Sequence, residues 1–129
     1  MDSFLHFIPV QQRSVIIECL DGEEREFFLN KMIELQETIQ AMPVTYQQDG
    51  MGDNAIAHLH YFSGGQNWYI TEKDMEGDGT IQAFGMADLG FGSEMGYIGI
   101  AELVQINIIE LDLHWQKKTL AEISASERS

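Results

Sequence analysis

The stretch that decides the fold is residues 55–97, AIAHLHYFSGGQNWYITEKDMEGDGTIQAFGMADLGFGSEMGY. Three glycine-containing segments divide this stretch, at 63–65, 74–79 and 88–93, and their residues are typical of turns. The segments between the turns are short and rich in alternating apolar residues, which predicts β-strands. We therefore expect four successive strands, over 56–62, 68–72, 80–87 and 94–100.

Alternation along a strand also assigns side chains to the two faces of the sheet. In the second strand this places Trp68, Ile70 and Glu72 on one face, with Tyr69 and Thr71 on the other. A further strand is expected over 108–115, where apolar and polar residues again alternate.

The chain before this stretch carries helix signals. Pro9 suits the first turn of a helix over 9–20, although the β-branched run at 15–17 leaves a strand open there. Asp21 and Glu24 have the spacing of a capping box, which predicts the start of a second helix. Apolar residues then follow at steps of three and four, and Pro43 ends the helix near Ala41. The predicted apolar face consists of Phe28, Met32, Leu35, Ile39 and Met42.

These elements predict one α+β domain, with N-terminal helices packed on a mostly antiparallel meander sheet of about five strands. The expected parts are a helical segment at 1–42, a loop at 43–54, the sheet at 55–115 and a tail at 116–129. A short helix is expected at 101–104, and the tail is expected to fray after Ile123.

The charge of the chain is strongly negative, at -14 for 129 residues. Binding to nucleic-acid phosphates or to an anionic membrane needs lysine and arginine, so this charge argues against both. Between residues 32 and 116 there are 13 acidic residues and one basic residue, Lys73. The acidity is either a solubility device or a rigid surface, built on the sheet, that binds a basic partner.

The sequence gives no sign of export or membrane insertion. Its single cysteine, Cys19, excludes an intrachain disulfide and a cysteine-based zinc cluster, and its apolar surroundings predict a buried side chain. No basic, apolar leader is present at the N-terminus, and no apolar run has the length of a membrane span. We expect a cytoplasmic protein.

Two patterns suggest metal binding, and each has a simpler explanation. Asp74 to Ile81 matches part of an EF-hand loop, but position 12 is Gly85 and the flanks resemble strands, so an acidic hairpin turn explains it equally. His58 and His60 point the same way on one strand and could bind zinc or iron with a third ligand such as His114 or Asp112. Histidine pairs on half-buried strands are more often structural.

Carboxylates form two further patterns. Glu72, Glu94, Glu110 and Asp112 could gather on one sheet face and act in acid–base chemistry, although a solvated face gives the same pattern. Every second residue from Glu72 to Asp78 is acidic, which in an extended strand would mimic the phosphate spacing of a nucleic acid. Gly77 and Gly79 argue that a turn interrupts this row.

Five segments resemble one family in order and spacing: AHLHYF (57–62), WYITEKD (68–74), FGMADLG (84–90), EMGYIGIAEL (94–103) and ELDLHW (110–115). The chain from 43 to 120 resembles the domain of unknown function 2958 family, small proteins carried by plasmids, phages and integrated elements, often near anti-restriction genes. The resemblance implies an accessory protein of mobile genetic elements, and no activity, cofactor or catalytic residue. The recurrent positions that it implies are Trp68, Tyr69, Glu72, Gly85, Glu94, Gly96, Tyr97, Glu110, Asp112 and Trp115.

The leading hypothesis is a non-catalytic module that binds a basic host protein, such as a nucleic-acid-binding defence factor, as an anti-defence protein or DNA mimic. The alternative is a metal-binding protein or hydrolase that uses the carboxylates and histidines, and a structural or oligomeric accessory domain is the third. No cofactor and no catalytic residues are assigned. The candidate functional surface comprises Trp68, Tyr69, Glu72, Glu94, Tyr97, Glu110 and Asp112.

Overall fold

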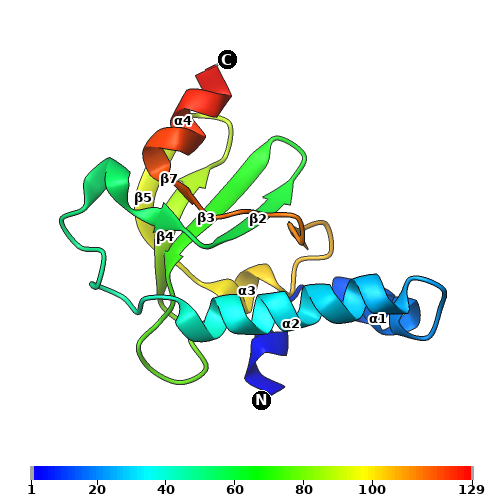
Figure 1. Cartoon of the computed structure of the whole chain (residues 1–129). Helices are drawn as coiled ribbons and strands as arrows, with labels where there is room; N and C mark the ends of the chain where they lie inside the picture. The colour runs from blue at the N-terminus through cyan, green and yellow to red at the C-terminus, as the bar shows by residue number, and fades with distance from the viewer. Residues whose placement is uncertain (1, 129) are drawn as a thin grey trace.

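A five-stranded antiparallel sheet forms the centre of the molecule, in the order β5-β4-β3-β2-β6. The computed structural model describes residues 2–128, with the side chains of 4–126. Consecutive strands from β2 to β5 are neighbours, so the predicted meander and the predicted α+β class are confirmed (Figure 1). The strands are β2 Leu59–Ser63, β3 Gln66–Glu72, β4 Ala83–Asp88, β5 Ser93–Ile98 and β6 Glu110–Leu111.

Three of the predicted strands differ most from the structure. The first strand is interrupted at His58, and its start, β1 (Ile56–Ala57), pairs instead with β7 (Lys118–Thr119). The third begins at Ala83 because the amides of Thr80 and Gln82 bond to aspartate side chains of the preceding turn. The last contains only Glu110 and Leu111, since the Asp112 side chain accepts the His114 amide in a local bond that competes with the sheet.

The helices are η1 Asp2–Phe7, α1 Val10–Leu20, α2 Arg25–Ala41, η2 Gly52–Asn54, α3 Ile100–Leu103 and α4 Leu120–Arg128. Residues 15–17 are therefore helical, and the strand alternative is wrong. The predicted capping box is also wrong, because Asp21 follows α1 as its C-cap and no side chain caps α2. The tail forms α4, which runs to Arg128 and buries Leu120 and Ile123, whereas the sequence predicts no helix there; fraying after Ile123 stays a prediction.

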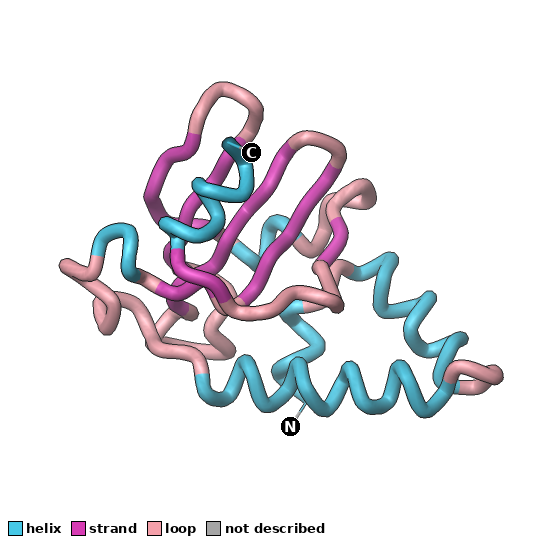
Figure 2. Tube along the Cα trace, turned by 45° about the horizontal axis from the view of Figure 1, so that its top comes forward, coloured by secondary structure: helices cyan, strands magenta, loops and turns pink. Residues whose placement is uncertain are grey.

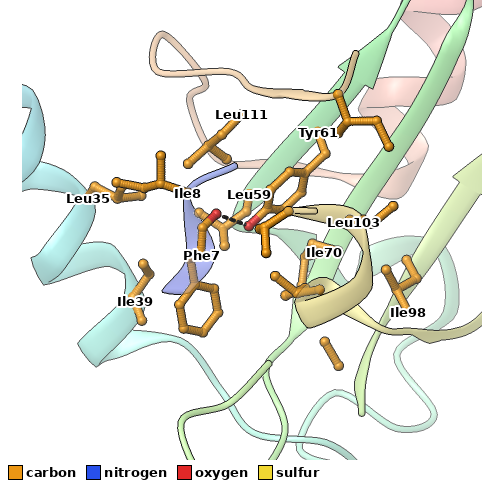
Figure 3. Packing of buried hydrophobic residues seen from close by; sticks show 14 of the residues in the cluster. Phe7, Ile8, Leu35, Ile39, Leu59, Tyr61, Ile70, Ile98, Leu103 and Leu111 are labelled. Atoms are coloured by element: carbon orange, nitrogen blue, oxygen red, sulfur yellow. Dashed lines mark hydrogen bonds between the residues drawn. The ribbon is translucent and has the colours of Figure 1, made fainter. Parts of the chain in front are cut away.

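Helices η1, α1, α2 and α3 cover one face of the sheet and form the main core with it (Figures 1 and 3). The predicted apolar face of α2 is confirmed, because four of its members are buried and Phe28 is partly buried against them. The main core consists of Phe7, Ile8, Ile16, Met32, Leu35, Ile39, Met42, Leu59, Tyr61, Ile70, Ala83, Ile98, Ile100, Leu103, Val104, Ile109 and Leu111.

A second, smaller core lies on the other face of the sheet. Helix α4 supplies Leu120 and Ile123, which pack with Tyr69 and Met86 from the middle strands. Strand β3 is therefore buried on both faces from Tyr69 onward. Its neighbour β4 approaches very closely at Gly85, where a Cβ atom would lie 1.9 Å from the carbonyl oxygen of Tyr69, so only glycine fits.

The hydroxyl of Tyr61 links the N-terminal segment to the sheet. It donates a hydrogen bond to the main-chain carbonyl of Phe7, and both residues are fully buried (Figure 3). Burial raises the pKa of Tyr61 because the phenolate would lose its hydration. The neutral hydroxyl therefore holds η1 against β2 on the main-core face of the sheet.

Replacing Tyr61 with phenylalanine should lower the free energy of unfolding by about 1–3 kcal/mol, because the buried Phe7 carbonyl loses its donor. Urea unfolding followed by circular dichroism would measure the change. Tyr97→Phe is the matched control, since Tyr97 is exposed, and its effect should stay within about 0.5 kcal/mol. Equal effects of the two substitutions would contradict this role of Tyr61.

Candidate functional site

A cavity of about 430 Å³ lies on the α4 face of the sheet, beyond the part that α4 covers. The loop 43–54 closes one side of it; Figure 2 shows this segment leaving the end of α2 and returning to the sheet through η2. We call this the loop cavity. It is lined by Thr45, Tyr46, Gln48, Asp49, Gly50, Gly52, Asp53, Ala55, Thr71, Glu72, Phe84, Met95, Tyr97 and Leu120.

Main-chain bonds to the residue after β3 position the start of the loop. Val44 forms a parallel bridge with Lys73, the Thr45 amide donates to the Lys73 carbonyl at 2.8 Å, and the Lys73 amide donates to the Pro43 carbonyl at 3.0 Å. The Lys73 ammonium donates to the Ile39 carbonyl at 2.6 Å, at the last turn of α2. The one lysine within the acidic stretch is thus used inside the fold.

The buried side chain of Gln48 holds the middle of the loop. Its amide group donates to the carbonyls of Ile56 and Thr71 at 3.0 and 2.8 Å, and its oxygen accepts the Ile56 amide at 2.8 Å. The Gln48 side chain thus bonds to the main chain of β1 as a second neighbouring strand would. These bonds hold the loop at the cavity wall.

A β-bulge brings Glu72 into the loop cavity. Ile70 pairs with Gly85, but Glu72 rather than Thr71 pairs with Phe84, so Thr71 is the extra residue. Uninterrupted alternation would place Glu72 beside Ile70 on the main-core face, as the sequence predicts. The bulge instead puts it on the face of Phe84, and the predicted orientation of Glu72 is wrong.

The carboxyl group of Glu72 is buried but has no cationic partner among the described residues. Only 4% of the residue is exposed, and its oxygens accept the Tyr46 amide and, at 3.4 Å, the Thr71 hydroxyl. None of the ion pairs formed within residues 4–126 includes Glu72. The bond from Tyr46 holds that residue at φ 79°, a left-handed conformation that is uncommon outside glycine.

The hydroxyls of Tyr46 and Tyr97 meet at the edge of the cavity, 2.6 Å apart. The bond joins the loop to β5, and the ring of Tyr97 packs edge-on against Phe84 with centroids 5.6 Å apart. This hydrogen bond is the main reason why the pKa of Tyr97 lies above its ordinary value, with smaller contributions from burial and from the nearby Asp49 and Glu72. Both tyrosines are more than half exposed.

The structure divides the residues of the predicted functional surface among several places. Glu72 and Tyr97 line the loop cavity, Trp68 packs on the main core and Tyr69 is buried in the second core. Glu94 lies on β5 and Glu110 on β6, the two opposite edges of the sheet. The four carboxylates expected to share a face are therefore not brought together.

Asp112 belongs to an aromatic cluster on the β2 side. It bonds to Nδ1 of His60 at 3.1 Å, while Nε2 of His60 lies 2.8 Å from the Asn67 oxygen. The ring of His60 stacks on Tyr69 at 4.7 Å and lies against Trp115 at 5.0 Å. These contacts give His60 a packing role between the second core and β6.

The histidines do not converge on a metal site. His114 lies near Phe27, away from the cluster around His60, and Nδ1 of His58 is buried without a hydrogen-bond partner. No group of three potential ligands that could hold a metal ion occurs among the described residues. The structure thus gives the metal hypothesis no assembled site.

The carboxylates of the acidic turn bind the turn itself. Asp74 accepts the amides of Glu76 and Gln82, and Asp78 accepts the amide and hydroxyl of Thr80. The Thr80 hydroxyl lowers the pKa of Asp78, with a further contribution from His6. These bonds account for the conformation of the turn, and the acidic row from 72 to 78 is not an extended strand.

Within residues 4–126, the acidic side chains do not gather on one face of the sheet. Asp88 and Glu122 also accept local bonds, from Gly90 and from Thr119. Other carboxylates lie on opposite sheet edges, at the α1–α2 turn and beside the loop cavity. The expected single acidic surface on the sheet is corrected accordingly.

Sequence reasoning missed most of the cavity. Tyr46, Gln48, Asp49 and Asp53 come from a loop with no periodic pattern, and its length beside a predicted sheet was the only available signal.

None of the helices within residues 2–128 has the length and apolar character of a bilayer-spanning segment.

A family model described as "Protein of unknown function (DUF2958)" matches residues 29–124. The match confirms the resemblance of the sheet region and extends it into α2. No curated protein and no solved structure matches the chain.

Replacing Tyr46 with phenylalanine should lower the pKa of Tyr97 towards its ordinary value, because the hydrogen bond that stabilises the neutral phenol is lost. NMR titration of tyrosine labelled with ¹³C would resolve the change. Tyr61→Phe removes a hydroxyl on the other face of the sheet and should leave the Tyr97 titration as it is. An unchanged Tyr97 pKa in Tyr46→Phe would show that the hydroxyls do not pair.

His58 should make the fold less stable in mild acid. Burial, with a smaller effect of Lys117, lowers its pKa from 6.5 to about 4. Between these values the unfolded chain binds a proton that the folded chain does not, so stability falls as the pH drops through this window. His58→Gln should lose less stability than the wild type between about pH 7 and about pH 5 in urea unfolding. His114→Gln, at an exposed position, is the control, and an identical pH dependence of all three proteins would refute this role.

Proposed function

This chain belongs to the DUF2958 family of proteins of unknown function, and we propose that it is a non-catalytic module that binds a basic protein through the loop cavity. The observation that carries the proposal is the lining of this cavity. It combines aromatic and methionine side chains with three carboxylic residues, and contains no lysine, arginine or histidine.

The apolar part of the site suits a protein partner. Tyr46, Met95 and Tyr97 line the cavity and are each at least 48% exposed, although large apolar side chains are normally covered. Tyrosine and methionine are enriched in protein interfaces because they offer a large contact area. An open cavity with such an edge can receive a projecting side chain of a partner.

The polar part of the site suits a basic partner. Asp49 and Asp53 are exposed in the loop, and no described residue forms an ion pair with them. The formal charge of -14 would also attract a basic protein over distances of about a Debye length, roughly 10 Å. Specific binding then depends on the carboxylates beside the cavity rather than on net charge alone.

Two other hypotheses lack a matching arrangement. The hydrolase hypothesis needs Glu72, Glu94, Glu110 and Asp112 together, and of these only Glu72 lines the cavity. A nucleic-acid decoy based on the acidic row at 72–78 needs an extended strand, and the row is folded into a turn. Binding of a partner protein at the loop cavity is therefore the proposal that the arrangement of these residues supports.

The finer biological role follows the family resemblance. Such proteins are carried by plasmids, phages and integrated elements, where accessory proteins oppose host defences. The proposed partner is therefore a cytoplasmic, nucleic-acid-binding defence protein of the host, because such proteins carry exposed lysine and arginine for phosphate contacts.

The test uses protamine, an arginine-rich polypeptide, as the basic probe in calorimetric titration. Asp49→Asn/Asp53→Asn should weaken binding about twofold to thirtyfold, because two exposed charge pairs contribute about 0.2–1 kcal/mol each. Binding should also weaken as the salt concentration rises.

Glu23→Gln/Glu24→Gln is the matched control. It removes the same charge from the exposed turn before α2, at the other end of that helix from the loop. Equal losses in the two double variants would mean that net charge alone attracts the probe, and the proposal would fail.

A further inference from the structure

We propose that the loop cavity is a receptor for one arginine side chain of the partner, with the Glu72 carboxylate as the group that receives the guanidinium. This inference rests on the proposed function and specifies the partner residue. It starts from the buried carboxyl group of Glu72. This group lines the loop cavity, and no lysine, arginine or histidine among the described residues forms an ion pair with it.

The nearest lysine in the sequence does not supply that cation. Lys73 follows Glu72 directly, but its ammonium bonds to the Ile39 carbonyl of α2. Glu72 accepts one main-chain amide and one long hydroxyl bond, whereas a carboxylate offers about four lone-pair positions. Acceptor capacity therefore remains in a site where burying an uncompensated charge is costly.

The geometry of the surrounding groups suits a planar cation. Phe84 and Tyr97 contribute rings in edge-to-face contact, and Tyr46 contributes a third ring from the loop. A guanidinium stacks on aromatic rings and is more weakly hydrated than an ammonium, so it enters a partly apolar cavity at lower cost. Its stem is long enough to place the charge inside while the partner's main chain stays outside.

The cavity lining also contains more acceptor groups than the three N–H donors of an ammonium can bond. Besides Glu72, the residues that line the cavity include Thr45, Thr71, Asp49 and Asp53, whose side chains all carry acceptor oxygens. Arginine has five N–H donors in a fixed plane, whereas lysine has three on one atom. The spread of acceptors from the buried floor to the exposed loop therefore favours arginine over lysine.

The experiment compares blocked five-residue peptides, Gly-Ser-X-Ser-Gly, in which X is arginine, lysine or citrulline. Citrulline has nearly the shape of arginine but no charge. The arginine peptide should shift the amide resonances of Tyr46, Glu72 and Tyr97 in ¹⁵N NMR spectra. It should bind at least about tenfold more tightly than the citrulline peptide, because charge-assisted hydrogen bonds are lost in the latter.

Glu72→Gln should abolish the preference for arginine over citrulline. The glutamine oxygen can still accept the Tyr46 amide, so the loop should keep its position, which the same spectra would show. Glu94→Gln, which removes one exposed charge from β5, is the control and should retain the preference. Tyr97→Leu provides a second variant at an exposed position and should weaken arginine binding by removing a ring.

Several outcomes would overturn the inference. Lysine binding as tight as arginine would make the cavity an ammonium site, and free L-arginine binding more tightly than the blocked peptide would make it a small-molecule site. Protamine binding that depends on Asp49 and Asp53, without peptide-induced shifts at the cavity, would refute the arginine receptor and leave the proposed function standing. If neither this protamine binding nor the peptide-induced shifts were observed, both the proposed function and the arginine receptor would be refuted.

Discussion

Strand β3 is the constraint on which the rest of the structure depends. It pairs with β2 on one side and β4 on the other, and four consecutive residues, from Tyr69 to Glu72, are buried. Its side chains therefore have to satisfy two environments at once. Ile70 contributes to the main core beneath the helices, and Tyr69 to the second core beneath α4. The close approach of β4 at Gly85 leaves no space for adjustment between these strands.

The loop cavity follows from what happens at the end of this strand. The bulge at Thr71 turns Glu72 away from the main core and towards Phe84. The carboxyl group then accepts the Tyr46 amide, and main-chain bonds to Lys73 hold the loop beside the strand. Because α4 covers only part of this face, a cavity remains between the loop and β5. One extra residue in β3 thus determines where the buried carboxyl group of Glu72 lies and which residues face it across the cavity.

The acidity of the chain serves several local purposes rather than one. Asp74 and Asp78 close a turn, Asp112 accepts bonds from His60 and His114, and Glu122 accepts bonds from Thr119 at the start of α4. In these places the carboxylates take the role of caps for main-chain amides that the sheet and helices leave unpaired. The acidic groups at the loop cavity differ, because they have no such partner among the described residues apart from the bonds to Glu72.

The sequence by itself determined the α+β class, the meander from β2 to β5 and the buried face of α2, because alternation, turn residues and helical spacing are local signals. It did not determine the ends of strands where aspartate side chains compete with the sheet, nor the pairing of β1 with β7 across the chain. Only the tertiary structure decided the loop cavity. A bulge reverses the face of a side chain without leaving a pattern in the sequence, and the residues opposite Glu72 come from a loop, two strands and a helix that are distant along the chain.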